Sequence, residues 1–310
     1  MPPQHSLDST LDCDVLVLGA GLAGLRAALA AKQAAARLRV VLVSPHLRPA
    51  GSSFANRNNA LGLQVPQANE ADAFVAEALG LAAPGLALPP LVRALAADAP
   101  ARLEELLDLG LAFRRTPGGS LERFPGCFSA APRAVIFDGL AAARAAFLAR
   151  AQAAGVELLH GCEALGLLRQ ADGRVCGARL SSLRGLRGQE VRDVRAAAVI
   201  AALGGPAPLF ARRICGPGGS GLSYGLLASA GARLVNAPYV QFFWVEAATL
   251  GFVNPGELVW PEHLAPLAEA RRAHCPTAYG LPDAALDQDL LARQDAQGHQ
   301  LLHFPPLAGL

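Results

Sequence analysis

VLVLGAGLAGL, residues 15–25, is an apolar run that leads directly into a G-x-G-x-x-G motif. An Ala-rich stretch with a helical pattern follows to about residue 36, and a second apolar strand is predicted over 39–44. This order of strand, glycine turn, helix and strand is typical of a βαβ unit that binds a dinucleotide. A glycine-rich turn without a ligand is the alternative, because the motif alone is weakly specific.

The three glycines of the motif have separate physical roles. Gly19 permits the tight turn, Gly21 allows the backbone to approach a pyrophosphate, and Gly24 allows the helix to pack closely on the strand. The free N–H groups at the start of the helix then face the phosphates, and the positive end of the helix dipole favours an anion there. We therefore expect a dinucleotide at this turn.

The composition is that of a globular protein. Of 310 residues, 52% are apolar and 17% are charged, and the net charge of +2 comes without a long basic run, which argues against nucleic acid. Six scattered Cys form no C-x-x-C, and no His spacing suits zinc, so we expect reduced thiols, no metal and a cytoplasmic location. No signal peptide or transmembrane segment is predicted.

The rest of the chain alternates between helix and strand patterns. Recurrent Pro and Gly predict a long loop over 45–68. A helical insert is expected over about 69–154, with helices near 69–80, 90–109 and 138–154, and Pro100 is expected to kink or divide the second one. The strand and loop predictions that follow are strands at 156–160, 163–168, 175–180 and 196–202, a hairpin turn at 171–174, and a basic connector over 183–195.

These patterns predict an α/β fold. A Rossmann-like parallel sheet is expected from residues 12–44, about 156–160 and 197–202. A β-rich excursion is expected over about 162–195.

Four motifs in this order resemble one flavoprotein family, that of L-aspartate oxidase and the flavoprotein subunits of fumarate reductase and succinate dehydrogenase. The first is the nucleotide fingerprint at 14–24, and the second is Gly-Ser-Ser-Phe-Ala at 51–55. The third is Ala-Ala-Leu-Gly-Gly at 201–205, and the fourth is Gly-Ser-Gly at 219–221 with Ala-Gly-Ala at 230–232 and Tyr-Val-Gln-Phe at 239–242. The resemblance implies a FAD-binding domain over 12–246 and a partial cap-like region over 247–310.

The resemblance also implies which residues bind FAD. Members that attach FAD covalently use a His in the second motif, where Ser52 stands here, so non-covalent FAD is implied. The implied cofactor-binding residues are Gly19, Ala20, Gly21, Leu22, Ala23, Gly24, Ser44, Pro45, Gly51, Ser52, Ser53, Ala164, Ala202, Gly204 and Gly205.

Several positions depart from the family pattern. Ser44 stands where many FAD proteins have the acidic residue that holds the adenosine ribose, which leaves a hydroxyl and backbone groups for that contact. Phe243 stands where the family has the His that helps bind the substrate dicarboxylate, and Phe cannot hydrogen-bond a carboxylate. Arg133 is a weak candidate for a contact with substrate or flavin, and no residue is assigned to catalysis.

The leading functional hypothesis is an oxidoreductase that transfers a hydride between a small organic substrate, possibly a carboxylate, and FAD. The alternative is a non-catalytic or partner-dependent FAD-binding subunit or fragment, because no segment that closes over the flavin is found before Leu310. In that case a second subunit completes the flavin site. A plain NAD(P)-binding Rossmann protein is the third hypothesis, and the motifs beyond residue 45 argue against it.

Overall fold

The computed structural model contains two compact units. The first comprises Met1–Asn56, Gly139–Ala211 and Cys215–Leu234, and the second comprises Arg57–Asp138, Arg212–Ile214 and Val235–Leu310. The structure describes residues 10–48, 50–81, 87–125, 129, 131–182, 191–210, 213–216, 218 and 221–235, together with the short strands Val245–Glu246 and Leu301–Leu302.

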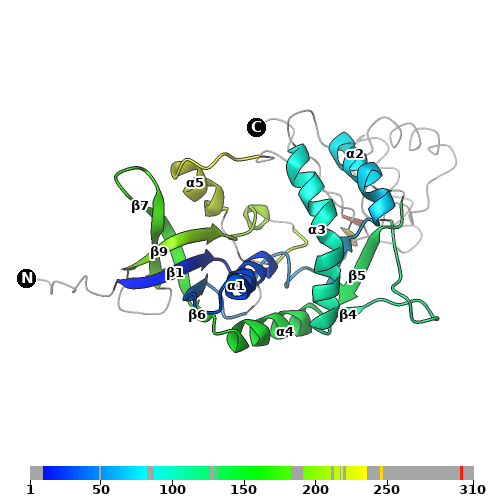
Figure 1. Cartoon of the computed structure of the whole chain (residues 1–310), viewed down its shortest axis with the longest axis horizontal. Coiled ribbons are helices and arrows are strands. Elements are labelled where there is room, and N and C mark those ends of the chain that lie inside the picture. The colour runs from blue at the N-terminus through cyan, green and yellow to red at the C-terminus, as the bar shows by residue number, and fades with distance from the viewer. Residues whose placement is uncertain are drawn as a thin grey trace, which may run out of the picture. The chain divides into compact units, whose positions relative to one another are not determined.

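The first unit is built on a six-stranded sheet with the order β6-β2-β1-β9-β8-β7 (Figure 1). The strands β6, β2, β1 and β9 are parallel, whereas β8 and β7 add an antiparallel arm beside β9. Their bounds are β1 Leu11–Leu18, β2 Val40–Ser44, β6 Glu157–His160, β7 Cys162–Arg169, β8 Val175–Ser182 and β9 Val191–Ala201. The predicted α/β fold with a parallel sheet and a β-rich excursion is confirmed.

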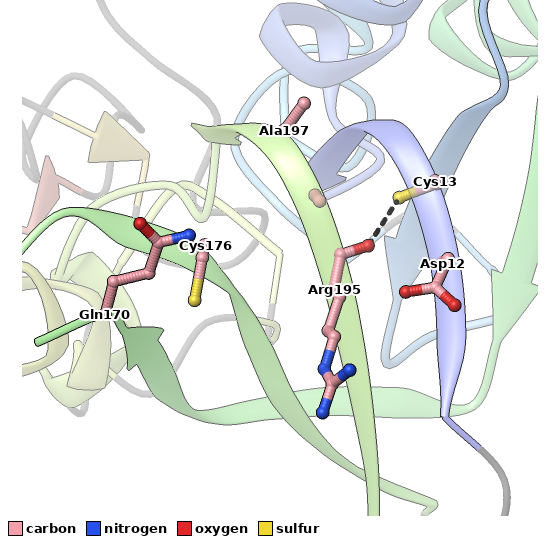
Figure 2. Close-up of a pocket in the computed structure, with 7 residues that line it drawn as sticks. Asp12, Cys13, Gln170, Cys176, Arg195 and Ala197 are labelled. Atoms are coloured by element: carbon pink, nitrogen blue, oxygen red, sulfur yellow. Dashed lines mark hydrogen bonds between the residues drawn. The ribbon is translucent and has the colours of Figure 1, made fainter.

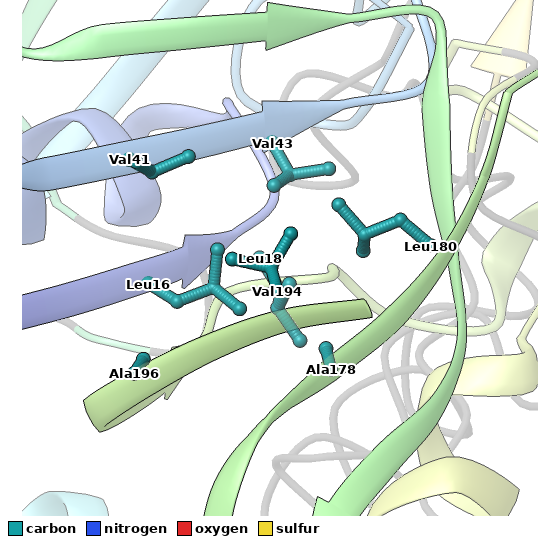
Figure 3. Packing of buried hydrophobic residues seen from close by; sticks show 8 residues of the cluster. All are labelled: Leu16, Leu18, Val41, Val43, Ala178, Leu180, Val194 and Ala196. Carbon is teal, nitrogen blue, oxygen red and sulfur yellow. The ribbon is translucent and has the colours of Figure 1, made fainter. Parts of the chain in front are cut away.

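The core of this sheet covers one face of its central strands, because the buried residues recur at every second position. Side chains from β1, β2, β8 and β9 form one buried cluster (Figure 3). Its members are Leu16, Leu18, Val41, Val43, Ala178, Leu180, Val194 and Ala196. Burial of each Leu or Val side chain contributes about 1.5–3 kcal/mol, so this cluster anchors the strands whose ends carry the candidate site.

Three helices belong to the first unit. Helix α1 spans Leu22–Ala34, α4 spans Leu140–Ala153 and α5 spans Leu222–Ser229. α1 packs on β1, β2 and α4, and its buried face consists of Gly24, Leu25, Ala28 and Leu29. The small residues on this face let the helix axis approach the sheet closely. α4 buries Leu140, Ala143, Phe147 and Ala151, which recur at the three- and four-residue spacing of one helix face.

The second unit has a three-stranded antiparallel sheet with the order β3-β5-β4. Its strands are β3 Ala60–Gln64, β4 Ala112–Phe113 and β5 Ala134–Asp138, and its helices are α2 Ala71–Leu81 and α3 Pro89–Asp108. A 3-10 turn, Ala68–Glu70, leads into α2. The rings of Phe113 and Phe137 meet edge to face with centroids 5.5 Å apart. A further strand pair joins β10 Val245–Glu246 to β11 Leu301–Leu302.

Four expectations about local structure are wrong in whole or in part. The loop expected over 45–68 contains strand β3, which pairs with β5 far along the chain, and the helix expected from residue 138 begins only after β5. The connector expected over 183–195 ends early because β9 begins at Val191, although 183–190 lie outside the described residues. Pro100 does not divide α3, which runs continuously over Pro89–Asp108, and the alternative of a kink stays a prediction.

Two further expectations fall outside the described residues. They are the cap-like region over 247–310, apart from β11, and the motif at 239–242 together with Phe243. Within the part of the chain that the structure describes, no helix is both long enough and apolar enough to cross a membrane.

Candidate functional site

The glycine turn between β1 and α1 lies against the end of β9. Gly19 has a φ of +110°, and its N–H donates to Val43 O at 2.9 Å, while Ala202 N donates to Leu18 O at 2.8 Å. A Cβ at Gly19 would lie 2.2 Å from Ala202 O, which is closer than atoms can approach. Glycine is therefore required here by both the backbone angle and the adjacent strand end.

The start of α1 is held against this turn and is left open to an anion. A Cβ at Gly24 would lie 1.7 Å from Gly19 O, so only glycine lets the helix pack at this distance. The helix begins after Gly21 without a side-chain cap, and its first turn contains no acidic residue. Its first N–H groups consequently have no carboxylate competing for them, as an anion site at a helix N-terminus requires.

Gly21 differs from the other two motif glycines because the protein does not fill the space beside it. A Cβ at Gly21 would meet only Ser53 Oγ, at 3.8 Å, and its φ of −76° is ordinary. The fold itself does not require glycine at this position, whereas a phosphate group lying on the backbone does. The uncapped N–H groups of α1 and the Ser53 hydroxyl are hydrogen-bond donors, and the open space at Gly21 leaves room between them. This arrangement fits the diphosphate of a dinucleotide.

The loop that carries Ser52 and Ser53 is held by two separate segments. Gly218 N donates to Ala50 O at 2.7 Å, and a Cβ at Gly216 would lie 2.5 Å from that same oxygen. On α4, Arg144 Nη2 donates to Leu47 O at 3.2 Å. The rings of Phe54 and Phe147 have their centroids 6.2 Å apart. The loop is therefore positioned by α4 and by the segment around Gly216.

Sequence reasoning missed the contribution of Gly216 and Gly218. Both glycines belong to the run Cys-Gly-Pro-Gly at 215–218. The clashes that a Cβ would make with Ala50 give both glycines a packing role. Glycine at alternate positions, 216 and 218, was the signal in the sequence that could have indicated a close backbone approach.

Ser44 ends β2 at the expected place and is buried. Its Oγ donates to His46 O at 2.8 Å and accepts from His46 N at 3.3 Å, while Ser44 O accepts from Gly161 N at 2.8 Å. Because the one hydroxyl proton is engaged, Ser44 Oγ can serve a further group only as an acceptor. A ribose hydroxyl that donates meets this requirement.

The Gly pair after β9 has space around it. Gly204 has a φ of +78° and no atom within 4 Å of a Cβ placed on it, and its carbonyl accepts from Ser223 Oγ at 3.1 Å. Gly205 lies near Tyr224 Oη, which would be 3.8 Å from its Cβ. Ala164 of β7, by contrast, pairs with Leu180 of β8 and packs on the core cluster. Among the described residues, no contact brings Ala164 to the glycine turn.

Arg133 lies in the second unit inside an ion-pair cluster. Its guanidinium is buried, donates from Nη1 to Glu77 Oε2, and has Nε 3.9 Å from Glu70 Oε1. The cation is thus balanced by two carboxylates of its own unit. A contact between Arg133 and substrate or flavin stays a prediction.

A separate hollow of about 430 Å³ lies near the beginning of β1 (Figure 2). It is lined by Asp12, Cys13, Gln170, Cys176, Arg195, Ala196 and Ala197. Cys13 Sγ donates to Arg195 O at 3.5 Å, and burial raises the pKa of the Cys13 thiol to about 11. This thiol is therefore protonated at neutral pH and is a poor nucleophile. Within the described residues, no group of three or more His, Cys, Asp or Glu side chains is placed to hold a metal ion.

Comparison with known proteins identifies the class. A model of the FAD binding domain family matches residues 14–265, which is more than half of the chain. The chain therefore belongs to this family of FAD-binding proteins. It is 34% identical over 235 residues to L-aspartate oxidase from Caulobacter vibrioides. The aligned region covers 73% of this chain and 44% of that enzyme. The chain thus spans less than half the length of this relative.

Solved structures share the fold. Sdh1 of Mycobacterium smegmatis matches with a TM-score of 0.63 and 23% identity, over 84% of this chain and 49% of that one. Quinol fumarate reductase from E. coli matches with a TM-score of 0.60 and 17% identity, over 80% of this chain and 42% of that one. The expected resemblance to L-aspartate oxidase and to the fumarate reductase and succinate dehydrogenase flavoproteins is confirmed.

Proposed function

We propose that the chain binds FAD non-covalently at the glycine turn and serves an oxidoreductase of the L-aspartate oxidase and fumarate reductase type. The observation that carries this proposal is the open space at Gly21, bordered by Ser53 and the uncapped start of α1. Membership of the FAD binding domain family supports FAD over other dinucleotides.

Each part of the site has a defined task in this proposal. The N–H groups after Gly21 and the hydroxyls of Ser52 and Ser53 bind the diphosphate, and Ser44 accepts from a ribose hydroxyl. The backbone at Gly204 and Gly205 lies beside the cofactor, where the lack of side chains allows close approach. Bound FAD supplies a flavin ring that accepts a hydride from a substrate.

The substrate we propose is a small carboxylate-bearing molecule that differs from a plain dicarboxylate. The relation to L-aspartate oxidase supports a carboxylate. Phe243 in place of a hydrogen-bonding side chain supports a substrate with an apolar part, because an aromatic ring cannot stabilise a carboxylate by hydrogen bonding.

The test of cofactor identity is reconstitution of the purified chain with FAD, followed by gel filtration and a visible spectrum. We expect flavin absorbance to travel with the protein and the flavin to appear in the supernatant after acid precipitation. Flavin that stays with the precipitate would contradict non-covalent binding. Absence of flavin bands together with tight binding of NADH would contradict FAD as the ligand.

A second candidate is a FAD-binding subunit that needs a partner chain for activity. Phe243 favours it, because it stands where the family has a substrate-binding His and cannot hydrogen-bond a carboxylate. Under this candidate the purified chain binds FAD but does not reduce it with L-aspartate or succinate until a second polypeptide is added. Reduction at a useful rate by a small carboxylate with this chain alone would exclude it.

A further inference from the structure

Arg144 on α4 is a half-buried cation that has one hydrogen-bond partner among the described residues. Its Nη2 donates to Leu47 O at 3.2 Å, in the loop that follows β2. Burial lowers the pKa of the Arg144 guanidinium, and this shift has no contribution from a charged neighbour. Within the described part of the chain, no carboxylate forms an ion pair with Arg144.

In the part of the first unit that the structure describes, two other arginines are each paired with a carboxylate, unlike Arg144. Arg39 binds Glu157 and Arg179 binds Asp193 in the first unit, each through two hydrogen bonds to the carboxylate. Partial removal of a guanidinium from water is unfavourable unless an anion or several acceptors compensate for it. A single backbone carbonyl leaves most of the five N–H donors of Arg144 for another group.

The segments around Arg144 carry positive charge and no carboxylate. In the first unit, residues 45–56 and 139–156 contain no Asp or Glu, whereas the loop after β2 carries His46 and Arg48. Ser44 occupies the strand end at which a dinucleotide site often places an acidic residue against the ribose. This edge of the site therefore attracts anions, and an acidic side chain does not repel an extra phosphate there.

We propose that Arg144 binds a phosphate group of the nucleotide at the adenosine end of the site. This inference rests on the proposed dinucleotide function. Two sources present the same chemistry: the diphosphate of FAD, and a phosphate monoester on the adenosine ribose. An Arg beside the end of the second strand is the usual partner of a ribose phosphate in dinucleotide sites. The guanidinium supplies paired N–H donors that match phosphate oxygens.

The test compares four nucleotides on four proteins by calorimetric titration. The ligands are AMP, ADP, adenosine 2′,5′-bisphosphate and FAD, and the proteins are the wild type, Arg144→Met, Arg144→Lys and Arg150→Met. Arg150 lies on the same helix and is exposed, so its variant is the matched control. We expect Arg144→Met to weaken at least one phosphorylated ligand about tenfold or more, Arg144→Lys to weaken it less, and Arg150→Met to leave it unchanged.

The pattern across ligands identifies the source of the phosphate. A loss confined to adenosine 2′,5′-bisphosphate relative to AMP assigns the ribose phosphate, and a loss for ADP and FAD relative to AMP assigns the diphosphate. In both cases Arg144→Met reduces the salt dependence of binding, which a purely structural role would not change.

Two results would overturn the inference. If the wild type binds FAD and Arg144→Met binds all four ligands equally well, Arg144 only holds the loop through Leu47, even if the melting temperature falls. If the wild type binds none of the four, the proposed function fails together with this inference.

Discussion

The three glycines of the turn serve different ends. Gly19 and Gly24 are required by the fold itself, because a Cβ at either would overlap backbone atoms. Gly21 has ordinary backbone angles and open space, so the fold does not require glycine there, and we propose that the bound diphosphate does. The sequence predicts all three roles, since each follows from a fixed position in the motif.

A Gly19→Ala substitution tests the structural role. The new Cβ would need a φ near +110° and would overlap Ala202 O, so we expect the free energy of unfolding to fall by about 2–4 kcal/mol. Chemical denaturation of the purified protein measures this. An unchanged unfolding midpoint would show that the turn and the end of β9 are not in contact.

Other residue roles could not be predicted from the sequence. The hydroxyl proton of Ser44 is taken by His46 O, a contact that depends on the path of the loop after β2. The packing of Gly216 and Gly218 against Ala50 depends on two segments far apart in the chain. A local pattern contains no information about such partners.

At the scale of elements, the strands of the first unit were predictable, whereas β3, β4 and β5 of the second unit were not. The β1–α1–β2 unit and the β7–β8 hairpin follow from apolar runs separated by recognisable turns. Strand β3 pairs with β5 across α2 and α3, and its sequence Ala-Leu-Gly-Leu-Gln lacks β-branched residues. Tertiary pairing, rather than local propensity, makes it a strand.

The ion pair between Glu77 of α2 and Arg133, the residue before β5, predicts a specific stability effect. Glu77→Gln leaves the buried Arg133 guanidinium with only the weaker contact to Glu70, so we expect a loss of about 1.5–3 kcal/mol. The matched control is Glu104→Gln on the exposed side of α3, with an expected change under about 0.5 kcal/mol. Thermal unfolding of both variants measures the difference, and equal stability would contradict the structural role of Arg133.

The ion pair between Arg114, the residue after β4, and Asp138 of β5 predicts that the free energy of unfolding depends on pH. The Arg114 guanidinium hydrogen-bonds both oxygens of Asp138 and lowers the pKa of that carboxyl below its ordinary value of 3.8. A lowered carboxyl pKa stabilises the fold at pH values above the unfolded pKa, and this contribution disappears as the pH falls through the folded pKa.

The matching experiment is unfolding of the wild type and Arg114→Gln between pH 7 and pH 2. Both side chains are partly exposed, so we expect the free energy of unfolding of the variant to be about 0.2–1 kcal/mol lower than that of the wild type at neutral pH. Below the folded pKa of Asp138 this difference should disappear. Curves that stay separated by the same amount at every pH would contradict this.

At the scale of the whole molecule, the account depends on the first unit. Its sheet order, its buried cluster and its uncapped α1 are all features of a nucleotide-binding frame, and the FAD binding domain family matches residues 14–265. The chain covers 44% of L-aspartate oxidase from Caulobacter vibrioides, so its activity and substrate are proposals that need their own tests.

The most direct test of the central claim is a titration of FAD into the wild type, Gly21→Ala and Gly80→Ala. Gly80 lies on α2 with open space around it, so its variant controls for the added methyl group. We expect both variants to keep the wild-type free energy of unfolding within about 1 kcal/mol. FAD affinity should fall at least about tenfold in Gly21→Ala alone, because the Cβ occupies the space for the diphosphate. Gly21→Ala binding FAD as tightly as the wild type would contradict the assignment of this turn as the cofactor site.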